Sequence, residues 1–390
     1  MAMRILANYT PLSDIPPYVP CLLPALYDSL RHAGVPVYLS LFPILNMHGV
    51  PCYTHSAPDQ QTGIRNHFVN YARTDALGYG ELTDYLGFDA ESREAESFEQ
   101  GLELIRHNLS QDKPFVLFGA MYYLPYSKHY LSQDYLEKRL QSFHGAMTHW
   151  FSIYGLGEEE VLINDPTPQN YLGPLSLESL EKFWKGDRWI PELTGRLAFE
   201  EAYWTFGYCD VRIERRLTEE EVFQLSASSL KTAAFEYLAG REVDTTTDQE
   251  IGEIHFFGAS AYQQLRADLE RMLAEEANKQ SLAPYDECMF NLRYPHFFMQ
   301  NMLNDLAQLY GEPYANLARM HMPITTEIEK LGNMFRMNMN RKSQDITFAS
   351  RTLDKLQAVA VQEREFYEQV LRLFADQPLL SSQEQMAAGR

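Results

Sequence analysis

Three residues in the first half of the chain, Cys21, His149 and Asp165, have types and spacings suited to nucleophilic chemistry by a thiol. Cys21 opens a run with apolar residues at helical spacing, so we expect its sulfur at a helix N-terminus, where the positive end of the helix dipole favours a thiolate. His149 begins a β-type run, and a Gly turn joins this run to a second one that ends at Asp165. Such a hairpin places the carboxylate beside the imidazole and leaves the other ring nitrogen to activate a thiol. The pattern therefore predicts a Cys-His-Asp triad.

Simpler interpretations of the same residues stay open at this point. An isolated cysteine is more often a small buried hydrophobe than a nucleophile, and an Asp before a Pro often only initiates a turn. His149 could equally be a hydrogen-bonded structural histidine. Cys52, with His55 nearby, is a weaker alternative nucleophile, because residues so close along one loop seldom point a sulfur and an imidazole at each other. The irregular spacing of His48, His55 and His67 gives no helical pair of ligands, so we expect no metal site.

The segments that must position these residues differ in character between the two halves of the chain. Short β-type runs and helical patterns share the first half, whereas the second half consists of long segments with helical periodicity. The β-type runs are Pro36–Leu41, Phe115–Tyr123, Thr148–Tyr154, Glu160–Ile163 and Tyr208–Glu214, and the helical patterns among them are Cys21–His32 and Phe98–Leu109. The later helical segments are Thr218–Ala239, Ser260–Asn278, Pro295–Tyr310, Met320–Met337 and Asp345–Phe374. We therefore expect an α+β domain over residues 1–215 and an all-helical domain over residues 216–390.

Composition narrows the classes of function. The chain has 390 residues, 53 acidic and 33 basic, and a formal net charge of −20. Such a balance repels polyanions, so nucleic acid is a poor candidate partner, and it attracts cations such as a small amine. The four cysteines lie far apart, as in a reducing compartment. The sequence shows no stretch of signal-peptide or membrane-span length, so we expect a cytoplasmic protein without a membrane partner.

Several motifs of the first half resemble the butirosin biosynthesis acyltransferase family. They are Pro114–Tyr126 (PFVLFGAMYYLPY), the polar stretch with His129 and Tyr130, His149 opening a strand, Ile163–Pro166 (INDP) and Leu175–Leu180 (LSLESL). The spacing between Cys21 and His149 is also close to the roughly 130 residues between Cys and His in papain-like enzymes. The resemblance covers most of the chain. The helical half is similar only in its general helical pattern, as at Phe257–Ala259 and Glu363–Glu365.

What the resemblance implies is a papain-like cysteine-peptidase-type N-terminal domain followed by a helical domain. Cys21 would be the nucleophile, His149 the general base and acid, and Asp165 the orienting acid. The implied reaction is acyl transfer in natural-product biosynthesis. The acyl group would pass from the phosphopantetheine arm of an acyl or peptidyl carrier protein, through Cys21, to a small amine acceptor. No bound cofactor is expected.

Further expectations concern the surroundings of this cleft. The resemblance places the aromatic stretch beside it, so Tyr122, Tyr123 and Tyr126 are predicted substrate contacts, and His144 is another candidate. An oxyanion would bind the backbone N–H of Cys21 and a second donor that the sequence does not identify. An acidic carrier protein would need a basic patch, for which the candidates are Lys182, Lys185, Arg188, Arg341 and Lys342. A cysteine hydrolase and a non-catalytic interaction module remain alternatives, and a homodimer remains open.

Overall fold

The computed structural model divides the chain into two compact units. Unit 1 comprises Met1–Leu39 and Thr83–Leu217, and unit 2 comprises Ser40–Leu82 and Thr218–Arg390. The residues described are 3–17, 19–41, 51–59, 63–67, 86–141, 148–193, 205–244, 253–274, 282, 285–286, 288–289, 292–339 and 346–376. Each unit is described by itself below.

Unit 1 is built on an antiparallel sheet. Within its described residues the sheet has seven strands in the order β4-β9-β5-β6-β7-β8, with β1 paired to β6. The central strand β6 runs beside β5 on one side and β7 on the other, which brings its first residues next to the end of β7. The strands are β1 (Arg4–Ile5), β4 (Phe88–Glu94), β5 (Phe115–Ala120), β6 (Thr148–Leu156), β7 (Glu160–Asp165), β8 (Tyr171–Ser176) and β9 (Gly207–Ile213).

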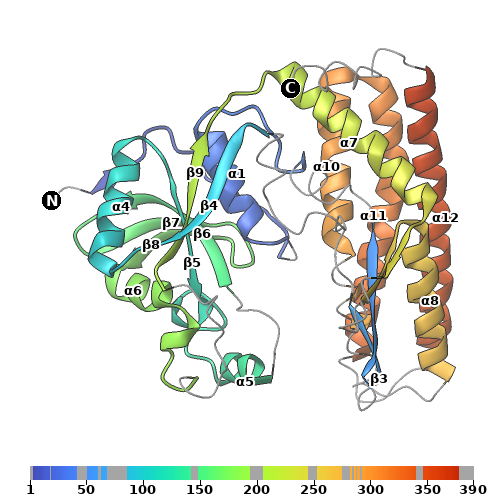
Figure 1. The fold of residues 1–390 in the computed structure, drawn as a ribbon, viewed down its shortest axis with the longest axis horizontal. Coiled ribbons are helices and arrows are strands. Elements are labelled where there is room, and N and C mark those ends of the chain that lie inside the picture. Colours follow the sequence, from blue (N-terminus) through green and yellow to red (C-terminus); the bar gives the residue numbers. More distant parts are fainter. Residues whose placement is uncertain are drawn as a thin grey trace. The chain divides into compact units, whose positions relative to one another are not determined.

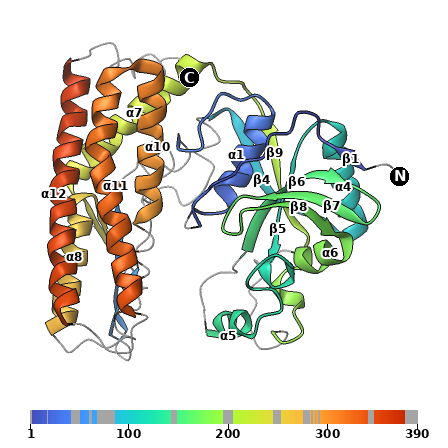
Figure 2. The ribbon, with the colours of Figure 1, turned by 180° about the vertical axis from the view of Figure 1, so that it is seen from behind.

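Helices cover both faces of this sheet. On β6, Ser152 donates to the carbonyl of Ala25 in α1, whereas the ring of Phe151 stacks on Phe183 of α6 with the centroids 4.8 Å apart. Because neighbouring residues of a strand point to opposite faces, α1 and α6 lie on opposite sides of the sheet (Figures 1 and 2). The helical elements are α1 (Leu22–His32), α4 (Phe98–Ser110), η1 (Met121–Tyr123), α5 (Gln133–Gln141), α6 (Leu177–Lys185) and η2 (Asp187–Trp189).

A glycine allows the close contact between α6 and the centre of the sheet. Gly119 on β5 pairs with His149 on β6. A Cβ atom at Gly119 would lie 2.1 Å from the carbonyl oxygen of Phe183, which no side chain could tolerate without a shift of the backbone. The glycine therefore lets α6 pack directly beneath the strand pair that carries His149.

Unit 2 combines a bundle of long helices with a small sheet. The helices pack successively, α10 on α11, α11 on α12, and α12 on both α7 and α8 (Figure 1). A capping box starts α7, in which Thr218 and Glu221 each satisfy a backbone N–H of the other. The helices are α7 (Glu219–Ala239), α8 (Ala259–Ala274), α10 (Arg293–Tyr310), α11 (Glu312–Met339) and α12 (Ile346–Asp376).

The sheet of unit 2 joins distant parts of the sequence. Its order among the described residues is β10-β11-β2-β3, and β11 pairs with β2 in antiparallel register. Cys52 and Tyr53 of β2 are fully buried in the same core as Phe257 of β11 and the helices. The strands are β2 (Cys52–Asp59), β3 (Gly63–His67), β10 (Glu242–Asp244) and β11 (Glu253–Phe257).

These findings confirm an α+β protein with a run of C-terminal helices and correct three expectations. The main boundary, between Leu217 and Thr218, lies close to the one expected, but residues 40–82 belong to the second unit rather than to a domain over 1–215. The second domain is not all-helical, because β2 and β3 complete a sheet with β10 and β11. No strand forms over Pro36–Leu41: Gly34 ends α1 with a positive φ of 72°, and irregular chain follows.

Candidate active site

Cys21 stands at the N-terminus of α1, as its sequence context predicts. It occupies the N-cap position, and no acidic residue lies in the first turn of the helix. Pro24 fits in that turn because the first N–H groups of a helix have no intrahelical acceptor to lose. The backbone N–H of Trp150, on β6, donates to Cys21 Sγ at 3.4 Å. A backbone N–H donor and the N-terminus of a helix thus both lie at this sulfur.

His149 and Asp165 form a direct, buried pair. His149 Nε2 lies 2.7 Å from Asp165 Oδ2, and the two side chains are 1% and 0% exposed. The antiparallel pairing of β6 and β7 produces this contact, since it sets the start of one strand beside the end of the other. The hairpin predicted from the sequence is therefore present, and Nδ1 is the ring nitrogen that remains for another partner.

Cys21 is this other partner, because its side chain is hydrogen-bonded to the imidazole of His149. Burial lowers the pKa of His149, but the charges of Asp165 and Cys21, together with hydrogen bonds to both side chains, outweigh burial and raise the pKa to about 10. An imidazolium at neutral pH next to a thiolate is the form in which a Cys-His pair is ready to act as nucleophile and acid. Thiol, imidazole and carboxylate thus lie together in the predicted order.

Polar contacts hold α1 against the two strands of the site. Asp28, one of the buried residues of α1, accepts hydrogen bonds from Tyr9 and, at 3.2 Å, from Asn164 Nδ2. Thr167, two residues after Asp165, donates to the carbonyl of Pro16 at 3.0 Å. The segment before Cys21 and the segment after Asp165 are therefore tied together on both sides of the catalytic candidates.

Tyr126 contacts the carboxylate of the candidate triad. Its hydroxyl donates to Asp165 Oδ2 at 3.0 Å, and its ring stacks on Tyr171 with centroids 3.8 Å apart and planes 3° apart. Burial, and then the charge of Asp165, raise the pKa of the Tyr126 hydroxyl well above its usual value, so it stays a donor. The sequence carried no signal for Tyr171, because only the pairing of β7 and β8 brings its ring to Tyr126.

The other predicted substrate contacts, Tyr122, Tyr123 and His144, differ in how far they are buried or described. Tyr122 is 6% exposed and packs in the core of unit 1 against Tyr123 and Tyr135, whereas Tyr123 is half-buried. His144 lies outside the described residues. The substrate roles of these three residues stay predictions.

Cys52, the alternative nucleophile, is fully buried in the core of unit 2 and so is a poor candidate. Of the histidines considered as metal ligands, His48 and the side chains of His55 and His67 fall outside the description. Elsewhere in the described part of the chain, no group of three or more His, Cys, Asp or Glu residues is placed to hold a metal ion.

Two lysines of the candidate basic patch form ion pairs on α6. Lys182 pairs with Glu178 at 2.6 Å and Lys185 with Glu181 at 2.5 Å, one turn apart along α6. The positive charge of each lysine is thus compensated by a glutamate on the same helix. Arg341 and Lys342 lie outside the described residues.

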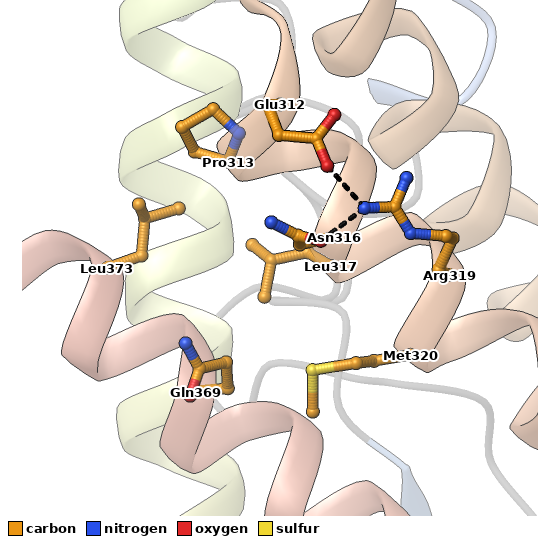
Figure 3. A pocket seen from close by; sticks show the side chains of 8 residues that line it. All are labelled: Glu312, Pro313, Asn316, Leu317, Arg319, Met320, Gln369 and Leu373. Atoms are coloured by element: carbon orange, nitrogen blue, oxygen red, sulfur yellow. Dashed lines mark hydrogen bonds and ion pairs between the residues drawn. The ribbon is translucent and has the colours of Figure 1, made fainter.

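A separate pocket of about 600 Å³ lies in unit 2, between the start of α11 and the end of α12 (Figure 3). Glu312 and Arg319 form an ion pair of 2.5 Å on one side of it, and Leu317, Met320 and Leu373 supply apolar walls. It has no cysteine or histidine in its lining, so it offers no second nucleophilic centre.

Comparisons with known proteins identify no relative of this chain. No model of a known protein family matches the sequence, and a search of curated proteins finds no match. Among the described residues, no helix is long and apolar enough to cross a membrane.

Proposed function

We propose that this protein is a papain-like cysteine acyltransferase of natural-product biosynthesis. The observation that carries the proposal is the buried His149–Asp165 pair with Cys21 at its open side. The likeness of the sequence motifs to the butirosin biosynthesis acyltransferase family supports the choice of acyl transfer over other thiol chemistry. The papain-like assignment rests on the same likeness and on the early cysteine at a helix N-terminus.

The first half-reaction forms an acyl-enzyme. The Cys21 thiolate attacks the carbonyl carbon of a thioester, and the carbonyl electron pair moves onto oxygen. When the tetrahedral intermediate collapses, the C–S bond to the carrier arm breaks and the imidazolium of His149 gives its proton to the departing thiolate. Asp165 holds the imidazole in place throughout. The products are an acyl thioester on Cys21 and a free carrier thiol.

The second half-reaction releases the acyl group as an amide. The neutral amine of the acceptor attacks the Cys21 thioester, and His149, now uncharged, takes the proton that the amine loses. Collapse of this intermediate breaks the bond to Cys21 Sγ and returns the thiolate next to the imidazolium. The N–H of Trp150 and the N-terminus of α1 stabilise the leaving thiolate.

The partners proposed are a carrier protein bearing phosphopantetheine and a small cationic amine. The net charge of −20 favours a cationic acceptor. The same charge disfavours an acidic carrier, and the ion pairs of Lys182 and Lys185 reduce the positive charge available on α6. Carrier docking would therefore depend on contacts other than these two lysines.

The first experiment is intact-protein mass spectrometry after incubation with acyl thioesters of a pantetheine analogue. We expect the wild type to gain one acyl group on Cys21 and Cys21→Ala to gain none. Cys209→Ala is the matched control, because burial and the charges of Asp210 and Asp89 raise the pKa of that thiol to about 12. The control should acylate like the wild type.

The fate of the adduct separates the proposal from its alternatives. Discharge by amines faster than by water supports a transferase, whereas discharge by water at the same rate with or without amine indicates a hydrolase. No adduct on Cys21 with any thioester, together with ordinary thiol reactivity, would overturn the catalytic proposal and favour an interaction module.

A further inference from the structure

A fourth side chain, that of Tyr126, is bonded to the candidate triad. Its hydroxyl reaches the same carboxylate oxygen, Asp165 Oδ2, that contacts His149 Nε2, at 3.0 Å and 2.7 Å respectively. The imidazole and the phenol therefore share one acceptor. Any change in the position or charge of this oxygen acts on His149 directly.

Asp165 has few other means of stabilisation. The residue is 0% exposed, and its second oxygen, Oδ1, is buried without a hydrogen-bond partner among the described residues. A carboxylate removed from water stays charged only where hydrogen bonds or opposite charge replace its hydration. The side chains that contact it are the imidazole of His149 on β6 and the phenol of Tyr126. Of these, Tyr126 is the neutral donor in contact with the carboxylate.

The direction of the Tyr126 hydroxyl is set by packing rather than by the hydrogen bond alone. Its ring lies flat on that of Tyr171, and the Tyr171 hydroxyl donates to the carbonyl of Pro174 at 2.8 Å, further along β8. Tyr126 thus connects the segment after η1 to β8 and aims its hydroxyl at the end of β7. A ring held in this way keeps its donor in place when a substrate enters or leaves.

We propose that Tyr126 is a positioning residue that acts through Asp165, and that Tyr171 holds it in place. This role rests on the proposed function, since it presupposes that Asp165 orients His149 for work on Cys21. It differs from the substrate contact predicted for Tyr126 from the sequence. A positioning residue changes the reactivity of Cys21 toward any reagent, whereas a substrate contact changes only the use of the substrate.

The test measures the rate of Cys21 alkylation by iodoacetamide as a function of pH in wild type and Tyr126→Phe. The phenyl ring preserves the stack on Tyr171 and removes only the donor. We expect the acid limb of the profile to move up by about one pH unit and the rate at pH 6 to fall about tenfold, the size expected for one hydrogen bond to a charged group. The low-field N–H resonance of the His149–Asp165 hydrogen bond should shift as well. With an acyl thioester, kcat should fall and KM should change little.

The matched control is Tyr135→Phe. Tyr135 is also a buried tyrosine of unit 1 that donates to an aspartate, Asp187 Oδ1, at 2.7 Å. Removing its hydroxyl should reduce stability without moving the pH profile or the imidazole resonance. If both variants shift the profile equally, the effect is a general loss of stability and the proposal is wrong.

A double-mutant cycle with Asp165→Asn completes the test. If Tyr126 acts through the carboxylate, Tyr126→Phe will change the alkylation rate less than twofold in the Asp165→Asn background. An equal loss in both backgrounds, or a rise in KM alone, would assign Tyr126 to the substrate instead. Should Tyr126→Phe fail to fold, Tyr171→Leu keeps the hydroxyl of Tyr126 but removes the ring that holds it. An unchanged profile in that variant would overturn the proposal.

The outcome also separates this inference from the proposed function. A wild-type Cys21 with the pH profile of an ordinary thiol means that the triad is not active. A reactive wild type with an unchanged Tyr126→Phe leaves the triad intact and removes only Tyr126 from it.

Discussion

The residue on which the proposed chemistry depends most is His149, because it is buried and yet charged. Its ring faces Asp165 on one side and Cys21 on the other, and the charges and hydrogen bonds of these two side chains outweigh the cost of burial. The pKa of His149 is thus raised from 6.5 to about 10. A raised pKa means that the proton stabilises the folded site fully below about pH 6.5 and that this stabilisation is lost as the pH rises through 10.

This charge predicts a difference between two pH profiles. Acyl transfer needs the proton of the imidazolium for the leaving thiol, so its rate should fall as the pH rises through about 10. Alkylation of Cys21 needs only the thiolate, so its rate should not fall there. Stopped-flow turnover and iodoacetamide labelling over pH 6–11 provide the comparison. Parallel loss of both rates at high pH would show that unfolding, not proton donation, causes the decline.

At the residue scale, types and spacing in the sequence were enough to predict which thiol, imidazole and carboxylate lie together. They were not enough to predict the residues that support them. Asn164 contacts Asp28, and Tyr171 contacts Tyr126, only because particular strands and helices are neighbours in space. A single sequence carries no local signal for such neighbours.

Among the elements, α1 has the greatest influence on the site, because it carries Cys21 at its start and docks through polar groups. Asp28 is 1% exposed, and burial raises its pKa although its hydrogen bonds with Tyr9 and Asn164 oppose the shift. A buried carboxylate with specific donors restricts the rotation of α1 about its axis, and its position along that axis, more narrowly than apolar contacts alone. The position of Cys21 Sγ relative to His149 depends on that fit.

We therefore expect Asp28→Ala to weaken both stability and reactivity. The change leaves the Tyr9 hydroxyl and the Asn164 amide without their buried acceptor, a loss of about 2–4 kcal/mol. It should also lower the alkylation rate of Cys21. Urea unfolding followed by fluorescence, with labelling at pH 7, measures the two effects.

The control for this prediction is Glu103→Ala, which breaks an exposed pair with Arg106 on α4. Exposed pairs contribute about 0–1 kcal/mol, so stability and labelling should hardly change. A stable Asp28→Ala protein with normal labelling would show that apolar packing alone positions α1.

Most helices were predictable because their periodicity is local. The segment Thr218–Ala239 and the helix Glu219–Ala239 agree nearly to the residue, and Thr218 caps the helix. The strands β2 and β11 were not predictable in the same way. Each needs the other as its partner, and about half of the chain lies between them.

At the scale of the whole molecule, unit 2 is built from two separate stretches of the chain, so its C-terminal stretch should not fold alone. The core of unit 2 includes Cys52 and Tyr53, and the Tyr53 hydroxyl donates to Asp268 at 2.9 Å. The fragment Thr218–Arg390 lacks both residues and the strand partner of β11. We expect this fragment to show no cooperative thermal transition by circular dichroism and to regain one when the segment Ser40–Leu82 is fused to it.

The complementary fragment provides the control. Residues 1–39 joined to 83–217 by a short linker contain the complete core of unit 1, so they should fold and retain a reactive Cys21. Cooperative melting of Thr218–Arg390 alone, at the temperature of the full chain, would contradict the assignment of residues 40–82 to unit 2.

The pairing of β2 with β11 also has a consequence for synthesis on the ribosome. The hairpin of β2 and β3 emerges early, but Glu253–Phe257 follows only after the whole of unit 1 has been made. At typical translation rates the nascent chain carries an unpaired strand edge for on the order of ten seconds or more. Such an edge invites association with other chains. Slow translation or a shortage of chaperones should therefore cause aggregation through this hairpin and reduce the yield of intact protein before it affects the fold of unit 1.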